Sequence, residues 1–456
     1  MARRFVISPG IPILVLLIAA LGAQARTRPH YGGALRIETQ GDPWQMPDGL
    51  ARRLVLDTLT TVSDTGLAQP SLALRWTSQN ADHRWEFTLR PGVRFQDGAP
   101  LTGESVAAAL SDACTRGVAA TAPLACPWRM VRAVGDSVVF VSDTAVPDLP
   151  ALLAQEVFAI ARQDASGAVI GTGPFRVTGF AGGALVLAAN DDCWAGRPFA
   201  DTIEIHSHRT VRDQWLDLSV GRADIVEVPP EMIRQAQQQH LNVLVSRPVD
   251  LLALTIAPNG AFSGREMRQA VALAVDRAAL SNVIFQKQGE VTASLLPQAL
   301  SGYAFLFSTD RNLDRARALR GGASPSAVVL SAEDTSATMH LAAERLALNL
   351  HEAGFTLQVA ASDPSAALTL RRAHLEAASP AAALDEMMAH FGQNGTVTAT
   401  GPESLWQTER SVLDNETIVP LLWLPRAWAA GDRVRDLRLS PDGAPLLADA
   451  SLEGAK

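Results

Sequence analysis

Apolar and polar residues alternate in short runs along this chain, and amphipathic helices separate the runs. The alternation over residues 85–89 predicts a β-strand, and it resumes over 93–95 after the turn signal Pro91-Gly92, which predicts a β-hairpin. Over residues 106–113 the apolar positions recur at i, i+3, i+4 and i+7, which predicts a helix capped by Thr102.

The segment 326–360 predicts a βαβ unit. Val328–Leu330 forms an apolar strand, an apolar stripe then runs at helical spacing from Met339 to Leu350, and Gly354 precedes a second alternating run. The two strands of such a unit are expected to be parallel. Short strands mixed with helices along most of the chain predict an α/β fold.

The N-terminus has the pattern of an export signal. Arg3 and Arg4 precede an uncharged apolar run from Ile13 to Ala23, which is shorter than a membrane-spanning helix. Small residues in Ala23-Gln24-Ala25 suit a signal-peptidase site. We therefore predict a signal peptide over residues 1–25 and a periplasmic location, with an uncleaved membrane anchor as the alternative.

Composition excludes several classes of protein. The 456 residues are 47% hydrophobic and 19% charged, and 39 basic against 47 acidic residues give a net charge of −8. This balance argues against a disordered chain and against a nucleic-acid partner. Only one apolar stretch is directed to a membrane, which excludes a multi-span membrane protein.

The three cysteines do not make a disulfide scaffold or a four-cysteine zinc site. Cys114 and Cys126 flank a short loop, and export to an oxidising compartment favours a disulfide between them. The alternative is two buried thiols. Cys193 is left over, and we expect it to be a small buried residue.

Catalytic and metal signals are weak. The chain carries no P-loop, no Gly-x-Ser-x-Gly elbow and no His-Glu-x-x-His, and we can assemble no nucleophile, base and oxyanion site. We therefore expect no enzyme activity and no cofactor. Glu204, His206 and His208 share one face of a predicted strand and are a possible metal set. The alternative is a solvated polar face opposite two isoleucines, so no metal site is predicted.

Several motifs at fixed spacing resemble one family, the family 5 extracytoplasmic solute-binding proteins of ABC transporters, which include peptide and nickel binders. The most specific resemblance joins Gln69–Trp76 to Trp85–Thr102. The other similar segments are Gly171–Phe175, Leu187–Pro198, Gly221–Asp224, Met267–Arg277, Leu313–Leu319 and Ile418–Leu421.

The resemblance implies the type II periplasmic binding protein fold (cluster C), in which two lobes surround a cleft and an extra subdomain is inserted. Lobe one would comprise residues 31–60, 172–249 and 425–456, and the inserted subdomain residues 61–171. Lobe two would comprise residues 250–424. The implied function is capture of a small solute, foremost a peptide-like one, and delivery to an ABC permease by a monomeric binding protein.

The positions expected to line the cleft have three sources. Asp42 and Trp44 follow the first predicted strand, where the acid would face a cation and the indole would stack. Gly173 and Phe175 belong to the turn that joins the domains in the family. The remaining candidates are the lobe-two residues Asn259, Trp406 and Trp423.

Residues 361–404 are alanine-rich and look shortened. We find there no counterpart of the Asp-Pro-containing stretch that, in the family's peptide binders, supplies an aspartate for the peptide's amino group. A buried ammonium without that partner is costly. Two alternatives therefore stay open: a sensor or accessory receptor that has lost transport, and a binder of nickel or a metal chelate.

Overall fold

The computed structural model describes most of the chain beyond the predicted signal segment 1–25, which lies outside the described residues. The described ranges are 30–44, 49–119, 126–164, 167–303, 306–322, 327–393, 397 and 401–453. Across these ranges, no helix combines the length and the apolar character that crossing a membrane requires.

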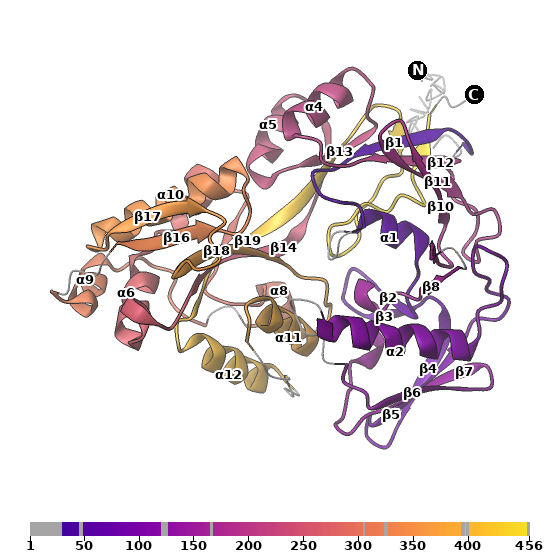
Figure 1. The fold of residues 1–456 in the computed structure, drawn as a ribbon, viewed down its shortest axis with the longest axis horizontal. Coiled ribbons are helices and arrows are strands. Elements are labelled where there is room, and N and C mark those ends of the chain that lie inside the picture. The colour runs from indigo at the N-terminus through magenta and orange to yellow at the C-terminus, as the bar shows by residue number, and fades with distance from the viewer. Residues whose placement is uncertain are drawn as a thin grey trace, which may run out of the picture.

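One sheet of 11 strands runs through the molecule in the order β10-β11-β12-β1-β13-β19-β14-β18-β16-β17, and β15 pairs with β19. We call the part built on β10 to β13 lobe one and the part built on β16 to β18 lobe two (Figure 1). The strands β14 and β19 belong to both. This mixed α/β architecture with two lobes agrees with the fold class predicted from the sequence.

In lobe one, helices cover both faces of the sheet. The helix α1 packs on one face together with the C-terminal segment, and α4 and α5 pack on the other face. The elements of lobe one are β1 (Ala34–Glu38), α1 (Leu50–Val55), β10 (Phe175–Ala181), β11 (Ala184–Ala189), β12 (Thr202–His206), α4 (Val211–Ser219), β13 (Ile225–Val228), a 3-10 turn (Pro230–Met232), α5 (Ile233–Gln238), β20 (Val434–Arg435) and β21 (Ser451–Leu452).

Lobe two is also layered, with one apolar cluster beneath α6, α9 and α10 and another on the opposite face beneath α8, α11 and α12. Its elements are β14 (Asn242–Ile256), a 3-10 turn (Gly260–Phe262), α6 (Arg265–Ala274), α7 (Arg277–Ala279), a π-helical turn (Leu280–Ile284), β15 (Glu290–Val291), α8 (Gln298–Ser301), α9 (Leu313–Arg320), β16 (Val328–Ala332), α10 (Ala337–Glu352), β17 (Leu357–Ala361), β18 (Leu368–His374), α11 (Pro380–His390), α12 (Pro402–Leu413) and β19 (Ile418–Ala430).

A subdomain with its own sheet, β4-β5-β7-β6, lies below lobe one in Figure 1. Its aromatic core packs against α2, which a disulfide between Cys114 and Cys126 ties to the following segment, with 5.7 Å between their Cα atoms. Its elements are β2 (Thr60–Val62), β3 (Ala68–Pro70), β4 (Ala73–Gln79), β5 (Arg84–Leu89), α2 (Gly103–Ala119), β6 (Met130–Val134), β7 (Ser137–Val141), α3 (Leu149–Leu152), a 3-10 turn (Glu156–Phe158), β8 (Arg162–Gln163) and β9 (Val169–Ile170).

Local predictions were confirmed in part. The βαβ unit is present, with β16 parallel to β17, and Thr102 caps α2 by accepting a bond from the Ser105 N–H at 3.2 Å. The predicted hairpin over 85–95 is wrong, because β5 pairs with β4 and β7 while Val93 and Phe95 insert into the subdomain core. The lobe boundaries at residues 61, 172, 250 and 425 stay predictions.

A buried carboxylate anchors a loop of lobe two to α12. Glu409 is fully buried and accepts bonds from the backbone N–H groups of Leu295 and Leu296, the latter at 3.2 Å, and from the Tyr303 hydroxyl. Burial raises the pKa of Glu409 to about 7, although the three bonds oppose that change. The folded protein therefore retains a proton on Glu409 at a pH where the unfolded chain has released it.

This retained proton predicts a pH dependence of stability. Glu409 ionises near pH 4.5 in the unfolded chain and near 7 in the folded protein, so its contribution declines as the pH rises between these values, by up to about 3 kcal/mol. We expect Glu409→Gln to flatten the unfolding midpoint measured against pH over that window. Glu403→Gln, at an exposed position of the same helix, is the control. An unchanged slope in Glu409→Gln would contradict the assignment.

Candidate functional site

Two long strands cross between the lobes and form a hinge. In lobe one, β14 pairs with β19 through residues 242–245 and 427–430. In lobe two, the same strands pair through residues 250–255 of β14 and 418–424 of β19. Between these segments the register shifts repeatedly, and Pro248 lies opposite Pro425. Proline has no N–H to donate, so the ladder is weakest where the chain passes from one lobe to the other.

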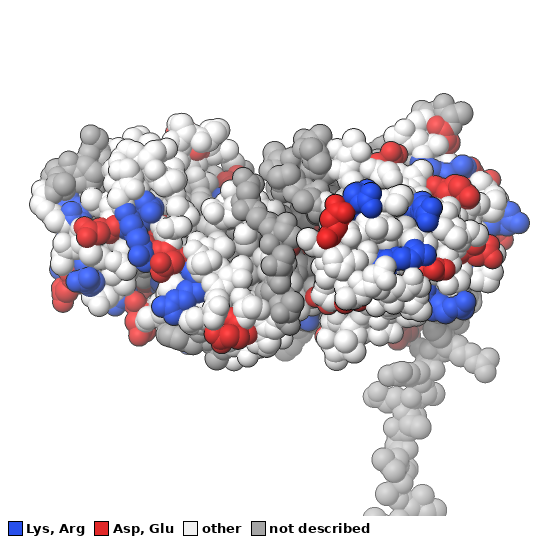
Figure 2. Space-filling view, turned by 90° about the horizontal axis from the view of Figure 1, so that it is seen from below, with Lys and Arg blue, Asp and Glu red and all other residues white. Residues whose placement is uncertain are grey.

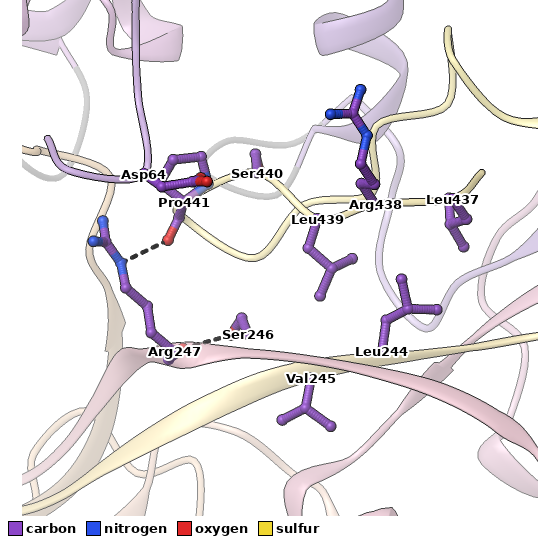
Figure 3. Close-up of a pocket in the computed structure, with 10 residues that line it drawn as sticks. All are labelled: Asp64, Leu244, Val245, Ser246, Arg247, Leu437, Arg438, Leu439, Ser440 and Pro441. Atoms are coloured by element: carbon purple, nitrogen blue, oxygen red, sulfur yellow. Dashed lines mark hydrogen bonds between the residues drawn. The ribbon is translucent and has the colours of Figure 1, made fainter. Parts of the chain in front are cut away.

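A hollow of about 570 Å³ opens over this hinge (Figure 3). We call it the hinge hollow. Leu244 and Leu439 point toward each other across it, and Arg247 closes one end by donating to the Pro441 carbonyl at 2.9 Å. Its volume is in the range of small-molecule sites. The lining residues are Asp64, Leu244, Val245, Ser246, Arg247, Leu437, Arg438, Leu439, Ser440 and Pro441.

A buried carboxylate stands on the lobe-two side of the hinge. Asp250 accepts bonds from Arg372 and Arg426, each at 3.0 Å from the Nε atom, and contacts His374 Nδ1 at 2.7 Å. Burial alone would raise the pKa of Asp250, but Arg426 and Arg372, together with His374, hold this pKa well below its usual range. Asp250 is therefore an anion that joins β14, β18 and β19.

A second set of charges, which we call the junction cluster, comprises Arg53, Glu156, Glu376 and Asp442. The Arg53 guanidinium lies 2.6 Å from Asp442 Oδ2, 3.1 Å from Glu156 Oε2 and 3.7 Å from Glu376 Oε1. These residues come from α1, the C-terminal loop, the subdomain and the segment after β18. The cluster therefore lies where lobe one, the subdomain and lobe two meet.

The acids of the junction cluster differ in their ionisation. Burial raises the pKa of Glu376 well above its usual range, and the neighbouring acids Glu386, Glu156 and Asp442 raise it further while Arg53 opposes them. Burial also raises the pKa of Glu156. For Asp442, burial is outweighed by Arg53, His374 and Arg426, so its pKa is lowered. Arg52 also pairs with Glu156, so two guanidiniums serve the three acids of the cluster.

Sequence reasoning missed Glu376 and Arg53. We found no counterpart of the family's Asp-Pro-containing stretch in residues 361–404, and we did not single out Glu376, which follows β18 directly and whose side chain is only 11% exposed. The sequence signal that could have identified Glu376 is its place between an apolar strand and the helix start Ser379-Pro380. For Arg53 the signal was a pair of arginines in the short, otherwise apolar helix α1.

The lobe-one candidates take part in local packing. The Asp42 carboxylate accepts the Trp44 N–H at 2.8 Å, and Trp44 rests on the lobe-one core. Gly173 approaches α1 so closely that a Cβ there would lie 2.7 Å from the Leu54 carbonyl oxygen. Phe175 is fully buried. Their roles in ligand binding stay predictions.

The lobe-two candidates are scattered. Asn259 is exposed before the 3-10 turn, and Trp423 is 2% exposed, with an indole N–H that has no hydrogen-bond partner among the described residues. Trp406 lines a separate hollow of about 270 Å³ with Tyr303, and Arg410 lies 4.8 Å above its ring. The structure does not bring these three residues to the hinge hollow, and their ligand roles also stay predictions.

The possible metal set is dispersed as well. Glu204 and His206 lie half-buried on β12, whereas His208 lies exposed beyond its end. In the part of the chain that the structure describes, no three His, Cys, Asp or Glu side chains are grouped so that they could hold a metal ion.

The surface charge is mixed. On the face shown in Figure 2, basic and acidic side chains alternate over both halves of the molecule, without a field of one sign. That face provides no stripe of positive charge for a nucleic-acid backbone.

The Asp250 contacts predict a large difference between buried and surface ion pairs. Asp250→Ala leaves Arg372 and Arg426 without their shared anion, and we expect a loss of about 3 kcal/mol in the free energy of unfolding. Glu333→Ala removes an exposed pair with Arg371 and should cost less than about 1 kcal/mol. Urea unfolding of both variants measures the difference, and equal losses would contradict a buried charge centre at the hinge.

Comparison with known proteins gives relatives of low identity and similar fold. The chain is 20% identical over 312 residues to the nickel-binding protein NikA of Staphylococcus aureus, covering 67% of this chain and 63% of NikA. It is 28% identical over 126 residues to the oligopeptide-binding protein AppA of Bacillus subtilis, covering 27% of this chain and 23% of AppA. The chain spans about half the length of the curated relatives it matches.

Solved structures agree over nearly the whole fold. DppA from Helicobacter pylori in complex with the peptide STSA superposes with a TM-score of 0.78 at 15% identity, covering 93% of this chain and 99% of DppA. The structure of AgaA in complex with agropinic acid superposes with a TM-score of 0.77 at 17% identity, covering 93% of this chain and 99% of AgaA. The model of the bacterial extracellular solute-binding proteins, family 5 Middle, matches residues 68–407, more than half of the chain, and the chain therefore belongs to family 5 of these binding proteins.

Proposed function

We propose that this protein is the extracytoplasmic solute-binding component of an ABC importer. It captures a small solute between its lobes and delivers the solute to a permease in the membrane. The observation that carries this proposal is the hinge formed by β14 and β19, beside which lies a hollow of ligand size lined by β14, the C-terminal segment of lobe one and Asp64 of the subdomain. The protein works in the periplasm as a monomeric binder without catalysis. Its lobes and subdomain have the boundaries that the sequence predicts.

A peptide-like solute suits the hinge hollow best. Leu244, Leu437 and Leu439 offer apolar contact, while Arg247 supplies positive charge and Asp64 negative charge. A small solute with apolar side chains and charged ends meets all three requirements. The names of relatives support the same class, since AppA and DppA are described as binding peptides.

A metal chelate is the second candidate. The relative NikA is named a nickel-binding protein, and its solved structure holds Ni(L-His)2, with a TM-score of 0.76 at 17% identity. A chelate brings its own ligands to the metal, so it needs no set of protein side chains around the ion.

The test starts with native mass spectrometry of the exported protein. A thermal-shift series with tripeptides, the nickel–histidine complex and agropinic acid follows. A bound solute raises the unfolding midpoint progressively with its concentration. A micromolar dissociation constant for the solute would correspond to a binding free energy of about −8 kcal/mol. No shift with any solute, from a folded protein, would favour the sensor alternative.

The site itself is tested by filling the hinge hollow. Leu439→Trp places an indole where the solute would lie, so we expect affinity for the responding solute to fall at least about tenfold, which corresponds to about 1.4 kcal/mol. Leu348→Trp, on the exposed face of α10, should bind the solute normally. Isothermal titration of both variants decides the matter, and equal affinities would place the solute elsewhere.

A further inference from the structure

Arg53 holds an unusual position, because one guanidinium contacts acids from three separate parts of the chain. Its Nε atom faces Glu156 of the subdomain, and its Nη2 atom faces both Asp442 of the C-terminal loop and Glu376 of lobe two. The three carboxylates are shielded, with side-chain exposures of 4%, 13% and 11% respectively. A guanidinium spreads five N–H donors over a planar fork, whereas a lysine ammonium has three donors around one nitrogen, so an arginine can serve acids that lie farther apart.

The contact with Glu376 connects the lobes. Backbone and side-chain bonds reinforce it, since the Glu156 N–H donates to Glu376 Oε2 at 3.2 Å and the Gln155 amide donates to Glu386 Oε2 at 3.3 Å. Glu386 in turn accepts the Glu376 N–H at 2.9 Å. Within the described ranges, Arg53 is the one cation in ion-pair contact with Glu376.

The neighbouring Arg52 provides a contrast. It lies on the same short helix and pairs with Glu156 alone, at 3.0 Å. Among the described residues, Arg52 forms no ion pair with Glu376 or Asp442. Arg52 therefore adds positive charge to the helix without bridging the lobes.

We propose that Arg53 is an internal cation that latches lobe one and the subdomain to lobe two. Its guanidinium fills the place among Glu156, Glu376 and Asp442 that a free guanidinium ion would otherwise occupy. The protein therefore holds its lobes in one relative placement with a side chain of its own. This inference goes beyond the proposed solute-binding function and does not depend on which solute binds.

Chemical rescue tests the proposal. Arg53→Ala leaves Glu156, Glu376 and Asp442 around a space of guanidinium size, so methylguanidinium chloride should raise the unfolding midpoint of this variant. We expect a rise of about 1.5 °C at ten times the dissociation constant. Sodium chloride at equal ionic strength, the native protein and Arg52→Ala should show no such rise. Absence of rescue in folded Arg53→Ala, or equal rescue of the native protein, would overturn the proposal.

A double variant covers the case in which Arg53→Ala does not fold. Removing Glu376 together with Arg53 removes part of the uncompensated acid, so Arg53→Ala/Glu376→Ala should unfold at a higher urea concentration than the sum of the single changes predicts. Additive losses of stability, or a double variant that is no more stable than Arg53→Ala, would overturn the proposed bridging role of Arg53. Both tests measure stability, so a solute panel without any hit counts against the proposed function and not against Arg53.

Discussion

The whole arrangement depends on two strands that serve both lobes. Because β14 and β19 are hydrogen-bonded to each other at both ends, the lobes share one continuous sheet. A rotation of one lobe must then be absorbed where that pairing is interrupted, around Pro248 and Pro425. The hinge hollow lies directly over this interruption, and Asp250 stands at its lobe-two end. The interrupted pairing, the hinge hollow and a buried charge are thus concentrated in a few residues.

Apolar packing and charge have different roles here. Five apolar clusters hold the layers of the lobes and the subdomain together, and each belongs mainly to one of these units. The junction cluster instead joins units. The free energy needed to remove these charges from water offsets much of the free energy of their attraction, so such a cluster contributes little net stability. It specifies one relative placement of the lobes, because Arg53 meets its acids only there.

Much of the local structure was predictable. The helix stripe of α10 and the Thr102 cap follow from contacts within a few residues, and both are present. The hairpin over 85–95 was not predictable from its turn signal, because β5 finds its partners in β4 and in the distant β7. Among the candidate site residues, Phe175 and Trp423 are buried, and their ligand roles stay predictions. An aromatic near a family motif packs equally well into a core, and sequence does not reveal which face of a strand is covered.

Periodicity, turn residues and motif spacing were enough to predict an α/β binding protein of family 5, because these signals act over short stretches of chain and recur throughout it. The hinge hollow and the junction cluster required the tertiary structure. Arg53, Glu156, Glu376 and Asp442 lie far apart in the chain and share no local pattern. Their electrostatic interaction becomes strong only when folding removes them from water and brings them within contact distance.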